Sequence, residues 1–396
     1  MNIYNRDTVI HFFSNILDHY AWQGLALCGV LIILFFTQLY YYAFAYYRIY
    51  SFRLLRQRKR RRANPAVSVI VVVRGENEPF LAKELPTLLK QTYASYEIVV
   101  VYVGSDIEYY DQLQSLRNDC SYMRLTKVGG NNHFFITTKQ ALNIGIKSAQ
   151  YDHLLFTTPG TTPRSERWVE YMAKGFERGN IVVGSSVPDF QRGGLRTYLM
   201  MMTEYHNLRN AMARAVADEL YYAPQSNYGF TKELYYATRG YNHLGIDIGD
   251  NDLYIQDLVR LNPRSVAVVL SPHSVVEERR SGVWSEWMEH TRYYGSTYND
   301  YPLSVRSFIR RERNSRVLFF LATLVALVVL PLELKIGAFV LLVMRYGIAL
   351  WSSHRTARKL GFRDVALRYW IYDLTGPLID TIIRSKESNN TPRIWT

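Results

Sequence analysis

Residues 66–305 alternate short, nearly continuous apolar runs with amphipathic segments, and this pattern predicts an α/β domain. The apolar runs are rich in β-branched residues and predict strands at Val67–Val73, Tyr96–Val103, Met123–Val128 and His153–Thr157. Apolar residues that recur every three or four positions predict helices at Phe80–Leu89 and Lys139–Ala149. Strands that are apolar on both faces and joined by helices form parallel sheets. We therefore expect a Rossmann-like, mostly parallel sheet covered by helices.

The alternation becomes less regular after Ser165. It predicts helices at Trp168–Phe176 and Leu195–Leu220, and strands at Ile181–Ser185 and Ser265–Leu270. We expect these elements to form the acceptor-side half of a two-part α/β enzyme.

Three apolar stretches outside this domain predict transmembrane helices at residues 22–47, 317–334 and 336–351. The first carries no charge and ends in a cluster of tyrosines, as aromatic belts at membrane interfaces do. The other two are separated by Lys335 and are expected to form a tight helical hairpin. Residues 352–396 are expected to form an amphipathic tail at the cytoplasmic interface, with a helix that is broken at Gly376-Pro377.

Arginine and lysine cluster in the linker 48–65, just before the second predicted span and just after the third. Basic clusters flanking spans stay on the cytoplasmic side, so residues 1–21 are expected outside and the globular domain in the cytoplasm. This arrangement predicts a multi-pass protein of the inner (plasma) membrane.

The net charge of +13 comes from these clusters, which hold 17 basic residues and one acid, so that the rest of the chain carries about −3. This distribution suits anionic membrane lipids as partners and argues against a nucleic acid. The two cysteines, Cys28 and Cys120, provide neither a disulfide framework nor a cysteine-based zinc site. The histidines share no metal-ligand spacing, so no protein-bound metal is predicted.

Several short motifs occur in an order and spacing typical of one enzyme family. They are Val67-Ser68-Val69-Ile70 with Arg74, Glu76 and Glu78; Glu97–Val101 closing in Gly104-Ser105; Lys139–Ile146; Leu154–Thr157 with Pro163 and Trp168; and Gly249–Leu253. With them, residues 67–300 resemble the inverting family-2 glycosyltransferases of GT-A fold, in the membrane-bound form. The resemblance implies sugar transfer from a nucleotide diphosphate to an acceptor hydroxyl, with Mg²⁺ or Mn²⁺ and a nucleotide-sugar required if the site is active.

The parts of that family that bind the donor are altered in this chain. Tyr102 stands where the family has a carboxylate for the nucleotide, and Thr158 and Gly160 stand where it has the metal-binding Asp-x-Asp motif. The basic residue expected before the Lys139 helix falls at Thr137 or Thr138. The donor-binding positions implied by the resemblance are Arg74, Glu76, Glu78, Tyr102, Lys139, Thr158, Gly160, His290 and Arg292.

Asp250 and Asp252 lie at the family's place for the catalytic base, which removes a proton from the acceptor hydroxyl. The same carboxylates would equally serve as helix caps, because negative charge in a first helical turn is stabilised by the helix dipole. For Arg74, Glu76 and Glu78 the alternative to a binding role is a solvated loop.

Two functional hypotheses follow. In the first, the protein has lost donor chemistry and acts as a pseudo-glycosyltransferase partner or scaffold in cell-envelope glycan assembly, together with other assembly proteins and a lipid-linked or polysaccharide acceptor. In the second, it is an active inverting enzyme that is metal-independent or uses a non-nucleotide donor, with cations such as Arg279 and Arg280 stabilising the leaving group. That arginine pair would alternatively balance Glu277 and Glu278. A transporter is excluded because one charge inside the spans, Arg345, makes no pathway; it should meet a phosphate or an acid on a neighbouring helix.

Overall fold

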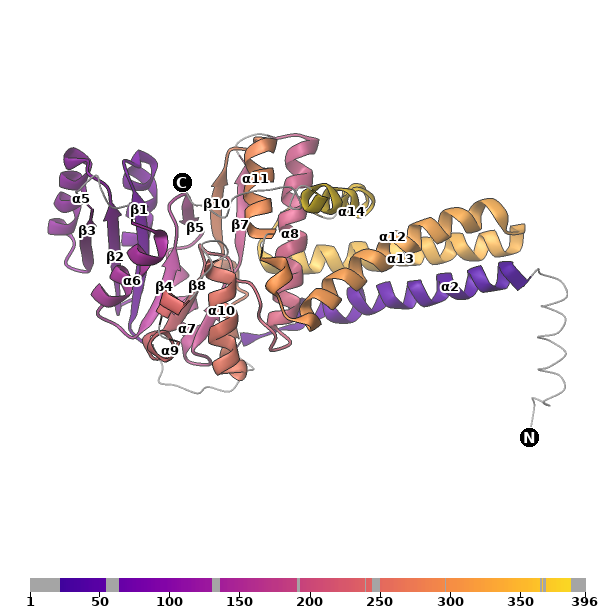
Figure 1. Ribbon diagram of the computed structural model, residues 1–396, viewed down its shortest axis with the longest axis horizontal. Helices are drawn as coiled ribbons and strands as arrows, with labels where there is room; N and C mark the ends of the chain where they lie inside the picture. The colour runs from indigo at the N-terminus through magenta and orange to yellow at the C-terminus, as the bar shows by residue number, and fades with distance from the viewer. Residues whose placement is uncertain are drawn as a thin grey trace.

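The computed structural model describes residues 22–54, 64–129, 136–190, 193–238, 240–243, 250–295, 297–363, 365 and 368–385. An α/β domain lies at one end of an elongated molecule, and three long helices project from it side by side (Figure 1). The predicted outer segment 1–21, half of the basic linker and the end of the tail lie outside the described residues.

The domain is built on a seven-stranded sheet with the order β3-β2-β1-β4-β8-β6-β9. Its strands are β1 (Val67–Arg74), β2 (Tyr96–Val103), β3 (Met123–Val128), β4 (His153–Thr157), β6 (Ile181–Val183), β8 (Tyr228–Thr231) and β9 (Val266–Val268). All neighbouring pairs are parallel except those of β8, which runs antiparallel to β4 and β6. The predicted strands are thus confirmed within a few residues, and β8 is the strand of this sheet that the pattern missed.

Helices cover both faces of this sheet because its strands are apolar on both sides. In β2, the residues from Tyr96 to Tyr102 are all buried. The covering segments are η3 (Phe80–Glu84), α4 (Leu85–Leu89), α5 (Ile107–Asp119), α6 (Thr138–Ser148), α7 (Trp168–Phe176), α9 (Lys232–Ala237), η4 (Gly240–His243), α10 (Asp250–Leu261) and η5 (Pro263–Ser265). Helix α5, which was not predicted, begins at Asp106, whose carboxylate accepts a hydrogen bond from the Tyr109 N–H at 2.7 Å.

A second, three-stranded sheet with the order β5-β10-β7 closes the domain on the side of the projecting helices. It consists of β5 (Thr161–Pro163), β7 (Ser186–Phe190) and β10 (Val276–Arg280). The polar sequence of β10 has no strand pattern, so the sequence did not predict this sheet. Around it lie α8 (Leu195–Ala215), η6 (Pro272–Ser274), α11 (Trp284–Gly295) and η7 (Tyr298–Asp300).

The projecting helices comprise a continuous N-terminal helix and a C-terminal hairpin. The first is α2 (Trp22–Leu39), continued by the π-helical η1 (Tyr40–Ala45) and by α3 (Tyr47–Ser51); the hairpin is α12 (Leu303–Val329) and α13 (Leu332–Leu360). The turn of the hairpin falls at Pro331, so Lys335 lies in the first turn of α13 and not between the helices. By length and composition, Trp22–Ser51 and Leu332–Leu360 are apolar enough to cross a membrane.

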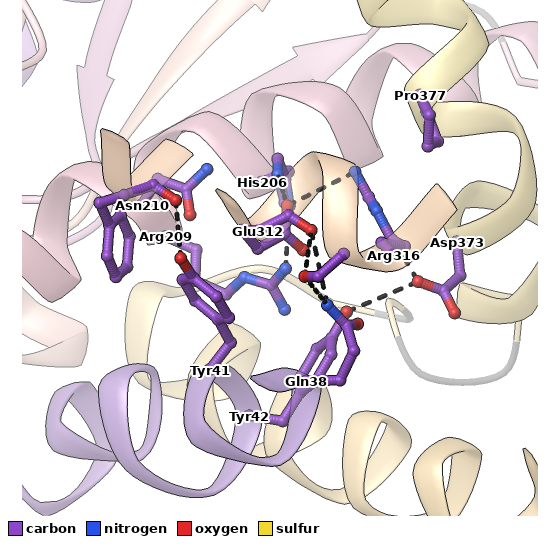
Figure 2. A network of polar contacts seen from close by, with 12 residues as sticks. Gln38, Tyr41, Tyr42, His206, Arg209, Asn210, Glu312, Arg316, Asp373 and Pro377 are labelled. Atoms are coloured by element: carbon purple, nitrogen blue, oxygen red, sulfur yellow. Dashed lines mark hydrogen bonds and ion pairs between the residues drawn. The ribbon is translucent and has the colours of Figure 1, made fainter. Parts of the chain in front are cut away.

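Helix α14 (Tyr369–Ser385) crosses the base of this bundle and packs against α8 and α11. The predicted break at Gly376-Pro377 is wrong, because the helix continues through Pro377. Between α14, α12, α8 and α2 lies a buried polar network (Figure 2), in which the Gln38 side chain donates to Ser315 Oγ at 2.7 Å and His206 Nε2 lies 3.5 Å from Glu312 Oε2. Buried polar groups require partners, so this network fixes how the bundle meets the domain.

Candidate functional site

A cavity of about 370 Å³ lies where the two sheets and the helices meet. One wall is the segment after β4, from Thr158 to Thr161, and the others come from β10, α8, α11 and α14. Its charged and imidazole side chains are Glu204, Glu278, Arg279, Arg280, His290 and Asp380. Carboxyl ends of strands in open α/β sheets are the usual place for a ligand, so this cavity is the candidate site.

Gly160 is tied to the rest of the cavity wall by its backbone. Its N–H donates to Glu84 Oε2 at 2.7 Å, and its carbonyl accepts from the Arg279 N–H at 2.8 Å. The other oxygen of the buried Glu84 lies 3.2 Å from Arg279 Nη2. Burial raises the pKa of Glu84, and the Gly160 N–H and Arg279 oppose that rise. Arg279 is therefore already engaged with a carboxylate.

Glu278 projects from β10 and is held on several sides. Its Oε1 accepts hydrogen bonds from Ser186 Oγ, at 2.6 Å, and from Ser226 Oγ, and its Oε2 pairs with Arg280 Nη2 at 2.5 Å. Burial acts to raise the pKa of Glu278, but Arg280 and the two serine hydroxyls outweigh it and the pKa is lowered. Glu278 is thus ionised at neutral pH, and Arg280 is its counter-ion.

Glu204 and His290 line the same cavity, and their pKa values are shifted in opposite directions. Burial raises the pKa of Glu204, opposed by Arg280 and by the Trp287 indole N–H, which donates to Glu204 Oε1 at 2.9 Å. Burial, together with Arg280, lowers the pKa of His290 to about 4. His290 is therefore neutral at pH 7, and the raised pKa of Glu204 favours its acting as a proton acceptor.

The charges of the cavity limit what it can bind. Three carboxylates, from Glu204, Glu278 and Asp380, face two arginines, and each arginine is paired with a glutamate. A diphosphate would meet repulsion here, whereas hydroxyl groups would find carboxylate and amide acceptors and donors. Tyrosine rings also line the cavity, at Tyr221, Tyr222, Tyr298 and Tyr301.

The predicted base residue Asp252 does not line the cavity. It is buried in α10, where its Oδ2 accepts hydrogen bonds from the Tyr301 hydroxyl at 2.6 Å and from Thr297 Oγ1 at 3.2 Å. Tyr301 does line the cavity. Asp250 begins α10, but its side chain lies outside the described residues, so its role as base or cap stays a prediction.

Tyr102 is a core residue at the end of β2. Its buried ring packs against those of Tyr109 and Tyr110, with centroids 5.6 and 6.0 Å away, and its hydroxyl donates to the Asp106 carbonyl at 3.3 Å. A buried aromatic ring therefore occupies the strand end where the sequence resemblance expects a nucleotide-binding carboxylate.

The other predicted positions are dispersed. Of the residues proposed from the sequence, the cavity brings together Thr158, Gly160 and His290. The Arg74 guanidinium instead donates to the Ile136 carbonyl at 2.9 Å. The remaining predicted residues whose side chains are described lie outside the cavity lining: Glu76, Glu78, Lys139 and Arg292.

Comparison with known proteins gives this fold and site a context. The profile of the family described as Glycosyl transferase family 2 matches residues 68–238, which begin within β1 and include β2 to β8 and the wall from Thr158 to Thr161. Residues 68–238 are a family-2 glycosyltransferase domain. No curated protein matches the chain in sequence.

The structure also resembles the mannosyltransferase PcManGT from Pyrobaculum calidifontis, solved in complex with GDP-Man and Mn²⁺. The TM-score is 0.51 at 14% sequence identity, and the match covers 88% of this chain and 99% of that chain. Because the structural match extends beyond the 171 residues of the family match, the likeness includes elements outside residues 68–238. It supports the GT-A-like α/β fold that the sequence predicted.

The residues present do not fit the metal ion of this family. At the metal-motif position, the Thr158 and Thr161 hydroxyls contact each other at 3.1 Å, and Gly160 has no side chain to offer. Within the described ranges, no three His, Cys, Asp or Glu side chains are grouped so that they could hold a metal ion. Neutral hydroxyls bind a hard divalent cation poorly, so we derive no chemistry through a metal in this glycosyltransferase domain.

Sequence reasoning missed Glu204 and Glu84 entirely. Glu204 lies within the long helix α8 and Glu84 within η3, and neither belongs to a motif. The sequence offers Arg279 and Arg280 either as cations for a leaving group or as counter-ions of Glu277 and Glu278. In the structure both line the cavity, and Arg280 pairs with Glu278. Arg279 pairs with Glu84 and not with Glu277, which pairs with Arg164. The acid paired with Arg279 is Glu84, which is distant in sequence, so no local pattern could have revealed it.

Proposed function

We propose that this protein is a membrane-anchored pseudo-glycosyltransferase of cell-envelope glycan assembly, which holds a saccharide acceptor in its cavity without a nucleotide-sugar donor. The observation that carries the proposal is the pairing of both cavity arginines: Arg279 with Glu84 and Arg280 with Glu278. A donor diphosphate carries two or more negative charges, and among the described lining residues both arginines already neutralise a glutamate. The buried Tyr102 ring supports the same proposal on the nucleotide side.

A saccharide suits the composition of this cavity. Its volume of about 370 Å³ is in the range of small-molecule pockets, and its tyrosines combine a ring face with a hydroxyl. Asn207 and Gln225 add amide groups that can both donate and accept hydrogen bonds. A lipid-linked or polysaccharide acceptor would present such hydroxyls.

The anchoring proposal rests on the two long apolar helices and on chain connectivity. Ile33, Phe36 and Phe44 of the N-terminal helix and Phe339 and Val343 of α13 are exposed in the monomer. If α13 crosses the membrane, the antiparallel α12 must return beside it, which gives three passes. The globular domain and its basic flanks then lie in the cytoplasm and the N-terminus outside.

A thermal titration tests the proposed loss of donor binding. Purified full-length protein would be heated with GDP-mannose or UDP-glucose, each with and without Mn²⁺. Since a ligand that binds the native state raises the melting temperature, we expect no metal-dependent rise. A rise that requires both sugar nucleotide and Mn²⁺ would overturn the proposal. An oligosaccharide from the envelope should raise the melting temperature without metal.

An active, metal-independent enzyme is the second candidate, and the raised pKa of Glu204 favours it. In that case Glu204 would take the acceptor proton while a non-nucleotide donor supplies the sugar. In cells, Glu204→Gln and Asp250→Asn at normal protein levels distinguish the two functions. Unchanged glycan assembly supports the scaffold, whereas its loss with saccharide binding retained supports the enzyme.

A further inference from the structure

A second, open hollow of about 480 Å³ lies where the C-terminal end of α13 meets the glycosyltransferase domain. Four basic or imidazole side chains line it: Arg164 after β5, His273 of η6, Arg358 of α13 and Arg363 beyond α13. The hollow and the cavity beside β4 have no lining residue in common. The proposed function therefore does not account for the hollow.

The floor of the hollow is fixed by contacts between the domain and α13. Arg164 Nε pairs with Glu277 Oε1 at 2.6 Å, and its Nη1 donates to the Gly361 carbonyl, also at 2.6 Å. His273 Nδ1 lies 3.1 Å from Ser165 Oγ. Gly361 has a φ of +88°, which lets the chain turn sharply at the end of α13 and places Arg363 at the same hollow.

Among the described residues, the lining of the hollow carries more positive charge than the nearby acids balance. Glu277 neutralises Arg164, but Arg358 and Arg363 are exposed, and among the described residues neither guanidinium has an ion pair or a hydrogen bond. Arg358 offsets the negative end of the α13 dipole, whereas Arg363 lies beyond the helix. Two free guanidinium forks around a preformed hollow match the oxygens of a phosphate group.

The hollow also lies at a suitable depth for a lipid phosphate. Trp351, which stacks on Tyr47, is the last large exposed apolar residue of α13, and Arg358 follows it by seven residues. At about 1.5 Å per residue this places Arg358 about 10 Å beyond Trp351. The headgroup zone of a bilayer is about 5–8 Å thick on each side, and an arginine side chain spans the difference.

We propose that this hollow is a phosphate-binding site, with Arg358 and Arg363 as the contacting residues and Arg164 and His273 as its floor. The phosphate belongs either to the headgroup of an anionic lipid or to a soluble ligand. Both present the same oxygens to the guanidinium groups, and the experiment separates them.

The test uses the purified full chain in neutral detergent. One arm counts phosphatidylglycerol molecules retained in native mass spectrometry, and the other follows the melting temperature with inorganic phosphate against chloride of equal ionic strength. The test variants are Arg358→Gln/Arg363→Gln and Arg363→Gln alone. The matched control is Arg355→Gln, on the same helix but outside the hollow, where Arg355 donates to the Tyr50 hydroxyl.

We expect the double variant to weaken binding by about tenfold or more in one arm, while the control binds like the wild type. An effect confined to phosphatidylglycerol identifies a lipid headgroup, and one confined to inorganic phosphate identifies a soluble ligand. Equal binding by the wild type and the folded double variant in both arms would overturn the proposal. Neither arm measures glycan assembly, so its outcome is separate from that of the proposed function.

Discussion

The guanidinium of Arg345 on α13 forms a two-pronged ion pair with the carboxylate of Asp373 on α14. Nη2 donates to Asp373 Oδ1 at 3.0 Å, Nη1 pairs with Oδ2, and Nη2 also donates to Gln38 Oε1 at 2.9 Å. Both charged side chains are buried. From the sequence, the expected partner of Arg345 was either a phosphate or an acid on a neighbouring helix. The structure shows that it is an acid, Asp373. This pair joins the two C-terminal helices to the N-terminal one.

Removing one partner of this pair should destabilise the protein strongly. Arg345→Ala or Asp373→Ala would remove the closest counter-charge of a buried ion, at a cost of about 3–5 kcal/mol in the free energy of unfolding. Arg345→Met/Asp373→Leu should cost less than the sum of the two single changes. Denaturation in detergent micelles measures these differences. The exposed pair Arg260–Asp257 is the control, and Arg260→Ala should cost less than about 1 kcal/mol. Equal costs for the two pairs would contradict this account.

Tyr301→Phe tests whether Asp252 is a structural residue. It removes the hydroxyl that donates to Asp252 at 2.6 Å, the shorter of the two hydrogen bonds to this buried oxygen, so we expect a loss of about 1–3 kcal/mol in stability. Tyr298→Phe is the matched control, because its hydroxyl donates to the Arg306 carbonyl over a longer 3.3 Å. If Tyr301→Phe left stability unchanged but abolished glycan assembly, Asp252 would have a chemical and not a structural role.

Gly145→Ala should destabilise the glycosyltransferase domain through overpacking. A Cβ at this position of α6 would lie 2.8 Å from Ile70 Cγ2 and 3.0 Å from Val101 Cγ2, in the middle of the sheet. Overpacking a core of this kind costs about 1–3 kcal/mol. At Gly337 on α13 no atom lies within 4 Å of an added Cβ, so Gly337→Ala should be neutral or slightly stabilising. A neutral Gly145→Ala would show that α6 can shift away from β1 and β2.

His290 should make stability depend on pH between about 6.5 and 4. Its folded pKa, about 4, is below the unfolded value near 6.5, so the unfolded chain binds the proton more readily in this range. The contribution of neutral His290 to the free energy of unfolding is therefore complete above pH 6.5. It is lost as the pH falls toward 4, at up to about 1.4 kcal/mol for each pH unit. His290→Gln should flatten this part of the profile of melting temperature against pH. The control is the exposed His354→Gln, and an identical profile for wild type and His290→Gln would refute the assignment.

The sequence determined most of the parallel sheet because each of its strands is defined locally. Runs such as Val67–Val73 and Tyr96–Val103 are apolar on both faces, and only a strand covered by helices on both sides buries such runs. The long apolar helices are likewise evident from composition alone. The sequence pattern did not predict β8 and β10, because Tyr228–Thr231 is short and Val276–Arg280 is mostly charged. Their strand conformation comes from pairing with β4, β6, β5 and β7.

In the candidate site, the sequence alone showed which positions differ from the family's donor-binding motifs. The tertiary structure decided which residues surround those positions. Thr158, Gly160 and His290 line one cavity, whereas Asp252 lies in the core and accepts a hydrogen bond from Tyr301. The pairing of Arg279 with Glu84 and of Arg280 with Glu278 could not be foreseen, because charge balance depends on distances between residues far apart in the chain. Local patterns determined the elements of this protein, and the contacts between them decided which of its charges remain available to a ligand.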